Sequence, residues 1–160
     1  MIIPFEQMPP NARVWVYQAE RELLDNETVV ITHQLQNFIN QWSSHGAEVR
    51  GACLIVHNQF IIIASDENAT SISGCSIDKS VHLLTNIGEN LKLNLIDRNV
   101  AFWVDGKVKT APTKMLKELI LTGYVNQETE IFNTTVDTIE AYHTNWKIPA
   151  QSSWVSRYFA

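Results

Sequence analysis

The order of extended and helical segments in residues 1–104 constrains the fold more than any other feature of this chain. Runs of β-branched and aromatic residues predict strands, and apolar residues spaced three or four apart predict helices. Two of the predicted strands are separated by only two residues, which indicates a hairpin. The predicted strands are residues 13–19, 51–57, 60–64 and 99–104, and the predicted helices run from Asp25 or Asn26 to about His45 and from Ser76 to about Leu91.

This strand–helix–strand–strand–helix–strand order is typical of the ferredoxin-like βαββαβ fold, an antiparallel sheet with both helices on one face. We therefore predict an α+β protein with a ferredoxin-like core. A mixed sheet with another strand order is the alternative, because order along the chain does not determine order in space.

The chain after this core contains a second hairpin and a third helix. Asp105 and Gly106 favour a type I′ turn, so residues 107–109 are expected to pair with the strand before them. Pro112 suits the first turn of a helix, and Gly123 can end it.

No linker or internal repeat divides the chain, so residues 1–160 are predicted to form a single α+β domain. Its core covers about residues 12–123, and residues 124–160 form a C-terminal extension that packs on the core. The third helix and the aromatic tail are expected to cover part of the open face of the sheet.

Charge and cysteine usage restrict the partners and the compartment. The formal net charge of −5 repels phosphate backbones and no run of Lys or Arg offsets it, so no nucleic-acid partner is expected. No apolar run approaches the roughly 20 residues of a membrane span, and the N-terminal residues lack the basic segment of a secretion signal. We predict a cytoplasmic protein without a membrane partner, in which Cys53 and Cys75 are reduced thiols.

The polar segment of residues 66–80 is the strongest candidate for a functional site. It joins an apolar strand to the start of a helix, and the unpaired N–H groups of a helix N-terminus stabilise anions and lower a thiol pKa. Gly74, Cys75 and Ser76 stand where this helix is expected to begin. Ser76 can cap the helix, and Asp78 would lie in its first turn, where a negative charge is favourable.

A ferredoxin-like sheet brings three parts of the chain to the same end of the sheet. These parts are the end of the third strand, the start of the first strand and the end of the first helix. Asp66, Arg13 and His45 are therefore expected to meet there. Cys75 and the turn at residues 105–106 belong to the same edge. The catalytic candidates are Cys75, His45 and Asp66, and the binding candidates are Gly74, Ser76, Asp78 and Arg13. The alternative is structural: Cys75 packs as a small apolar residue, and nearby acidic side chains raise its pKa.

Motifs of nucleotide and metal chemistry are missing from the sequence. The pair Gly106 and Lys107 lacks the first glycine of a phosphate-binding loop, since Ala101 stands in its place, and no G-x-G-x-x-G occurs. There is no C-x-x-C, H-x-x-x-H or H-E-x-x-H motif. We therefore predict neither a cofactor nor a metal, and P-loop ATP hydrolysis is not expected.

Five stretches carry a resemblance to a known family. They are P-P-N-A-R-V-W-V-Y-Q-A at residues 9–19, D-E-N at 66–68, S-G-C-S-I-D-K-S-V-H at 73–82, L-I-D-R-N-V at 95–100 and W-K-I-P-A-Q-S-S-W-V-S-R-Y-F at 146–159. In these stretches the chain resembles an uncharacterised family of about this length from Bacteroidetes-type bacteria. Members are often labelled transporter ATPases, a label that the missing Walker-type glycines and L-S-G-G-Q signature contradict. The resemblance implies no activity and assigns no catalytic residue.

The sequence favours a non-enzymatic binding or interaction module, because the core is ordinary, the net charge is acidic and no catalytic motif is recognised. Its partner is expected to be a protein or a small-molecule ligand. The aromatic segment 154–159 can pack on its own chain or dock on a second copy in a homo-oligomer. The alternative is a thiol-dependent or small-anion-handling enzyme that uses Cys75 at the helix N-terminus.

Overall fold

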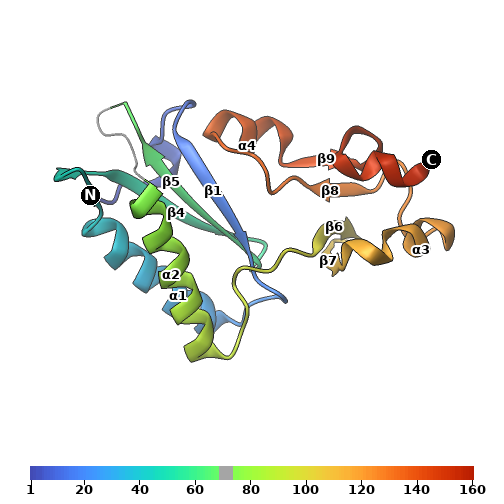
Figure 1. The fold of residues 1–160 in the computed structure, drawn as a ribbon, viewed down its shortest axis with the longest axis horizontal. Coiled ribbons are helices and arrows are strands. Elements are labelled where there is room, and N and C mark those ends of the chain that lie inside the picture. Colours follow the sequence, from blue (N-terminus) through green and yellow to red (C-terminus); the bar gives the residue numbers. More distant parts are fainter. Residues whose placement is uncertain (69–73) are drawn as a thin grey trace.

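The computed structural model describes the backbone of residues 1–68 and 74–160, and the side chains of residues 1–68 and 77–160. Within these residues the protein is a mixed α+β fold built on antiparallel sheets, which confirms the predicted class (Figure 1). The two larger sheets lie at opposite ends of the long axis (Figure 1).

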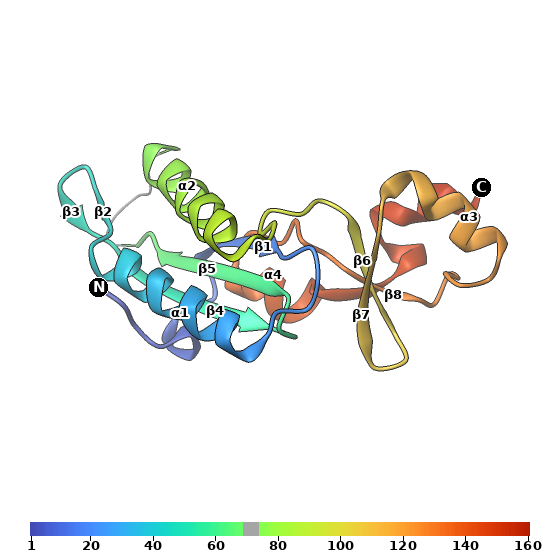
Figure 2. The same cartoon turned by 90° about the horizontal axis from the view of Figure 1, so that it is seen from below.

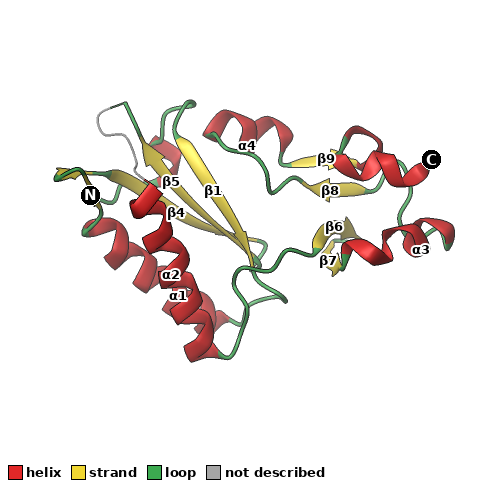
Figure 3. Ribbon diagram, in the orientation of Figure 1, coloured by secondary structure: helices red, strands yellow, loops and turns green. Residues whose placement is uncertain are grey.

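The first sheet has the strand order β1-β5-β4, with β1 at Arg13–Gln18, β4 at Arg50–Val56 and β5 at Phe60–Asp66. Every residue of the central strand β5 is buried, which explains its apolar sequence. Helices α1 (Asp25–Asn40) and α2 (Gly74–Leu91) cover one face of this sheet (Figure 3). The core between the helices and the sheet contains Ile31, Leu35, Ile39, Ile61, Ile63, Leu84 and Ile87.

The second sheet has the strand order β7-β6-β8-β9. The predicted hairpin is present between β6 and β7, with φ values of +52° at Asp105 and +74° at Gly106, as a type I′ turn requires. The four strands are β6 (Val100–Val104), β7 (Lys107–Ala111), β8 (Glu130–Phe132) and β9 (Lys147–Pro149).

The predicted ferredoxin-like order is not confirmed, because β6 does not return to the first sheet. It pairs with β7 and β8 instead. Two residues of β6, Val100 and Phe102, are buried in a separate core with Ile131 and Val155, which come from the last part of the chain. Strand β6 therefore packs on residues from the last part of the chain, and the order of segments alone does not reveal this packing.

Loops take the place of a fourth strand at the free edge of β1. The Val14 N–H donates to the Asp137 carbonyl at one end of the strand, and the Asp97 N–H donates to the Gln18 carbonyl at the other. Val16 lies between these two contacts. The edge of β1 is therefore closed at both ends.

The third helix does not cover the second face of the first sheet, which corrects that part of the prediction, whereas Trp146 of the tail does pack there. Helix α4 (Ile139–Asn145), β8 and N-terminal residues pack on this face. The rings of Phe60, Phe132 and Trp146 meet there with centroid distances of 4.7 to 5.3 Å. This aromatic cluster connects the two larger sheets.

The third helix and residues 154–159 of the aromatic tail pack together on the second sheet. Helix α3 (Leu116–Leu121) and the 3-10 segment Trp154–Phe159 enclose a core in which Leu116 and Val155 are fully buried. Trp154 is 40% exposed and meets the ring of Tyr158 edge to face. The tail therefore packs on its own chain.

The first helix ends earlier than its sequence pattern predicts. Helix α1 stops at Asn40, and a short hairpin of β2 (Ser43–Ser44) and β3 (Ala47–Glu48) follows. His45 and Gly46 form its turn, with φ values of +52° and +78°. The other short elements are the 3-10 segments Phe5–Gln7, Thr113–Met115 and Ala150–Ser152. None of the described helices is long and apolar enough to cross a membrane.

Glu27, rather than Asp25 or Asn26, caps the start of α1. Its Oε1 accepts a hydrogen bond from the Leu24 N–H at 2.8 Å, and its two oxygens accept from Arg21 at 2.9 and 3.0 Å. The hydrogen bonds from Arg21 and then from Leu24 lower the pKa of this buried carboxyl group.

We expect Glu27→Gln to lower the free energy of unfolding by about 1 to 2 kcal/mol at pH 7, because it removes a bidentate charge-assisted contact. Since the pKa of Glu27 is lower in the folded state, this stabilisation is present at neutral pH and is lost as the pH falls through the folded-state value. Urea denaturation at pH 7 and at a series of lower pH values measures both effects. The exposed Glu128→Gln is the control, and a loss that does not shrink as the pH falls would contradict the assignment.

Candidate functional site

The rim predicted around Asp66 is present in part. Asp66 is buried at the end of β5, where Arg50 approaches it to 3.8 Å and Asn68 donates to its Oδ1 from both its backbone and its side chain. Arg13 lies at the same edge and pairs with Glu67 at 3.4 Å. The structure therefore brings Asp66 and Arg13 to the same end of the first sheet. Asp66 contacts Arg50 and Asn68 there, and Arg13 contacts Glu67.

One other predicted member of the rim lies elsewhere. The turn at residues 105–106 lies near the opposite end of the first sheet, where Gly106 shares a cleft with His57 and Asn58. This corrects the prediction, and the reason is that β6 belongs to the second sheet. His45 occupies the turn between β2 and β3, and this hairpin lies at the end of the first sheet where α1 ends and α2 begins (Figure 2).

The helix start also differs from the prediction. Helix α2 begins at Gly74, so Ser76 lies inside the helix instead of capping it, and Asp78 falls after the first turn, where its side chain is exposed. The side chains of residues 74–76 lie outside the described residues. The thiol hypothesis for Cys75 therefore stays a prediction.

Cys53 is a free thiol on the outer strand of the first sheet, as expected for a reduced cysteine. Burial raises its pKa to about 11, so very little thiolate is present at neutral pH. Among the described residues, no group of three His, Cys, Asp or Glu side chains is placed to hold a metal ion.

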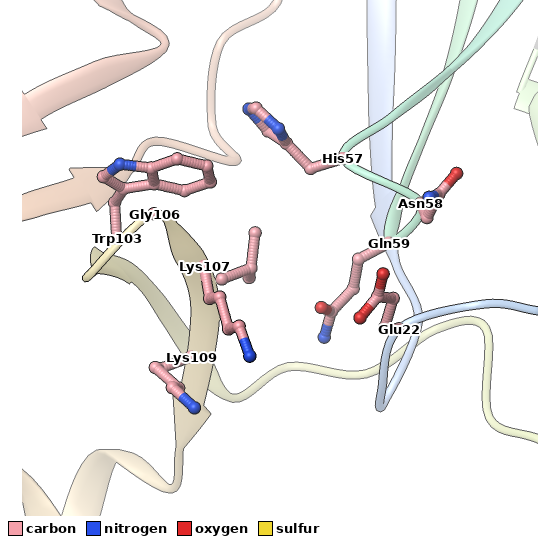
Figure 4. Close-up of a pocket in the computed structure, with 9 residues that line it drawn as sticks. Glu22, His57, Asn58, Gln59, Trp103, Gly106, Lys107 and Lys109 are labelled. Atoms are coloured by element: carbon pink, nitrogen blue, oxygen red, sulfur yellow. The ribbon is translucent and has the colours of Figure 1, made fainter.

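A cleft of about 520 Å³ lies between the β4–β5 turn and the β6–β7 hairpin (Figure 4). The two hairpins belong to different sheets, so the cleft forms where the sheets meet. In the β4–β5 turn the residues with positive φ are His57 and Asn58, both at +52°, whereas the two residues that separate the predicted strands are Asn58 and Gln59. The lining residues are Glu22, His57, Asn58, Gln59, Trp103, Gly106, Lys107, Val108 and Lys109.

Trp103 forms an aromatic wall of this cleft. Its ring lies 4.8 Å from the ring of His57 and 6.1 Å from that of Phe132, and the Nζ of Lys147 lies 4.6 Å from its centroid. The Phe132 ring also contacts His57, at 5.6 Å. Phe132 belongs to the aromatic cluster between the two larger sheets. Its contacts therefore connect the rings of Trp103 and His57 to the buried core.

The charges around the cleft are mostly positive. Lys107 and Lys109 extend from β7, and Glu22 and Gln59 lie across from them (Figure 4). Lys147 adds a third ammonium group at the aromatic wall. The cleft therefore collects basic side chains in a chain whose net charge is −5.

The surroundings of His57 favour its neutral form. Burial, followed by the charge of Lys147, lowers its pKa from the ordinary value of 6.5. A neutral imidazole can donate one hydrogen bond and accept another. The site thus offers a flat aromatic surface, a polar ring and ammonium groups, which together suit a planar anion.

The cleft was not predicted from the sequence, because its residues come from four separate segments. One available signal was the pair Lys107 and Lys109, which follows Trp103 and the Asp-Gly turn in an otherwise acidic chain.

Comparison of the chain with models of protein families, with curated proteins and with solved structures finds no match. The resemblance described above therefore rests on the sequence motifs alone.

Proposed function

We propose that the protein is a non-enzymatic binding module that takes a small planar anion into the cleft between the β4–β5 turn and the β6–β7 hairpin. The observation that carries this proposal is the aromatic wall of Trp103, with Lys147 over its ring and with Lys107 and Lys109 lining the same cleft. Pockets for small molecules typically combine an apolar surface with a few placed polar groups.

The charge pattern favours an anion over a neutral ligand. An anionic group near Lys107 and Lys109 would gain two attractive partners, whereas Glu22 is the one acidic side chain among the residues lining the cleft. The flat part of the ligand would lie against Trp103 and Val108, where burial of apolar area contributes affinity.

We further infer that the protein acts in the cytoplasm, a location that the free thiol of Cys53 supports, because reducing compartments maintain free thiols. Catalysis is not part of this proposal.

The proposal is tested with 2-naphthoate, a planar carboxylate, followed through the indole N–H resonance of Trp103 in the intact protein. We expect saturable binding with Kd between about 10 μM and 1 mM, as for a small ligand in an open cleft. The double variant Lys107→Gln and Lys109→Gln should weaken it about tenfold, since partly exposed charge contacts contribute little each.

The matched control is the double variant Lys114→Gln and Lys117→Gln, which removes the same charge from exposed positions near α3. It should bind 2-naphthoate as the unmodified protein does. Neutral 2-naphthol should bind more weakly than 2-naphthoate. Equal weakening in the two double variants, or no shift of the Trp103 resonance, would contradict the proposed site.

A further inference from the structure

Strand β7 forms the free edge of the second sheet beside the cleft (Figure 4). It pairs with β6 on one side only, in a register that places Lys107 opposite Val104 and Val108 opposite Trp103. Because Val104 and Lys107 close a two-residue turn, they exchange their backbone hydrogen bonds, and the direction of the backbone groups then alternates along the strand. The N–H of Val108 therefore points away from β6, and it has no hydrogen-bond partner among the described residues.

A lysine stands on each side of this N–H. Lys107 and Lys109 are two residues apart on β7, so their side chains leave the strand on the same face, and both line the cleft. Among the described residues, neither ammonium group has a carboxylate oxygen within 4.0 Å, whereas Arg13, Arg21 and Arg50 each have one. The edge thus presents two positive charges of the same strand face to the cleft, with a backbone donor between them.

We propose that this edge binds the phosphate group of a phosphate monoester whose other part is a flat aromatic ring. This inference rests on the function proposed above and names the class of its ligand. A phosphate monoester carries a charge of about −1.5 to −2 at pH 7 and offers three acceptor oxygens. These oxygens would accept hydrogen bonds from Lys107, Lys109 and the Val108 N–H. A carboxylate carries a single charge, so it would leave one of the two ammonium groups without a counter-charge.

The other walls of the cleft suit the aromatic part of such a ligand. The rings of Trp103 and His57 lie 4.8 Å apart and provide the flat surface. Trp103 belongs to the strand next to β7, and neighbouring strands are about 4.8 Å apart, so the ring and the phosphate of the ligand would lie close together. Glu22 lies across the cleft from the lysines (Figure 4). Its negative charge repels a phosphate on that side, which favours the β7 edge.

The test compares 2-naphthyl phosphate with 2-naphthyl sulfate, which has the same ring and a tetrahedral group with one negative charge. At about pH 8 the phosphate ester is a dianion, because its second pKa is about 6. We expect the phosphate ester to bind about five- to tenfold more tightly than the sulfate ester, since each partly exposed charge contact contributes little. Binding is followed through the indole N–H resonance of Trp103. The backbone amide resonance of Val108 should move when the phosphate ester binds.

The double variant Lys107→Gln and Lys109→Gln should bring the affinities for the two esters to within about twofold of each other. The double variant Lys114→Gln and Lys117→Gln is again the matched control and should keep the preference for phosphate. Inorganic phosphate has no ring to bury against Trp103, so it should bind at least about tenfold more weakly than 2-naphthyl phosphate.

Equal affinity for the two esters would overturn this inference, and the proposed function would stand because both esters bind. A preference for phosphate that survives Lys107→Gln and Lys109→Gln would overturn it as well, since the lysines would then only protect the free edge of β7. The same conclusion follows if inorganic phosphate binds as tightly as 2-naphthyl phosphate, or if the Val108 amide resonance does not move. If neither ester nor 2-naphthoate binds, the proposed function fails, and this inference fails with it.

Discussion

Phe132→Ala should lower the free energy of unfolding by about 3 to 5 kcal/mol, as large-to-small substitutions of buried aromatic residues do. Phe132 is 2% exposed, and its ring lies 4.7 Å from Phe60 and 5.3 Å from Trp146. The change leaves a cavity between the two larger sheets, where the surrounding strands are held by their own hydrogen bonds and cannot close it completely. Such a loss is a large fraction of the roughly 5 to 15 kcal/mol of a typical domain.

Urea denaturation measured by circular dichroism and by tryptophan fluorescence tests this expectation. The two probes should give one transition in the unmodified protein if the sheets unfold as a single domain. Leu121→Ala, at a side chain that is 87% exposed, is the control and should change the free energy by less than about 0.5 kcal/mol. A loss below about 1 kcal/mol in Phe132→Ala would show that the cluster does not connect the sheets.

The same substitution links the core to the candidate site. Phe132 contacts both His57 and Trp103, which line the cleft. Phe132→Ala should therefore also weaken the binding of 2-naphthoate under conditions where the variant is still folded. Leu121→Ala should leave that binding unchanged.

Local features of the fold could be predicted from the sequence because their causes are local. The turn at Asp105 and Gly106 requires positive φ at two adjacent residues, and this pair provides it. The apolar run of β5 reflects burial on both faces. By contrast, the prediction that the first helix extends to His45 was wrong. The helix stops at Asn40, and a short hairpin follows whose two-residue turn contains His45.

The strand order could not be predicted because it depends on distant parts of the chain. Strand β6 joins the second sheet, where Phe102 is buried with Leu116 and Val155. These residues belong to segments whose packing has no local sequence signature. The same reason applies to the site. Asp66 and Arg13 lie at one end of the first sheet, so their proximity could be predicted. The cleft could not be predicted, because it forms only where the second sheet lies beside the β4–β5 turn.

Gly88→Ala should destabilise the protein by about 2 to 3 kcal/mol, although alanine normally stabilises a helix by up to about 1 kcal/mol relative to glycine. Gly88 lies near the end of α2, where the chain reverses through Lys92 with a φ of +56°. The Leu93 N–H donates to the Gly88 carbonyl at 2.8 Å and the Lys92 N–H to the Glu89 carbonyl at 3.2 Å, the two hydrogen bonds of a Schellman motif. This reversal brings the Leu93 carbonyl oxygen into contact with the position that a Cβ on residue 88 would occupy.

The neighbour of that Cβ is a backbone atom, so it cannot move away without disturbing the end of the helix. We therefore expect the steric cost to exceed the gain in helix propensity, and urea denaturation measures the balance between them. Glu89→Ala, at the next position and exposed, is the matched control and should change the free energy by less than about 0.5 kcal/mol. A gain in stability for Gly88→Ala would mean that the chain does not pass this close to Gly88, because only an uncrowded helical glycine is improved by alanine.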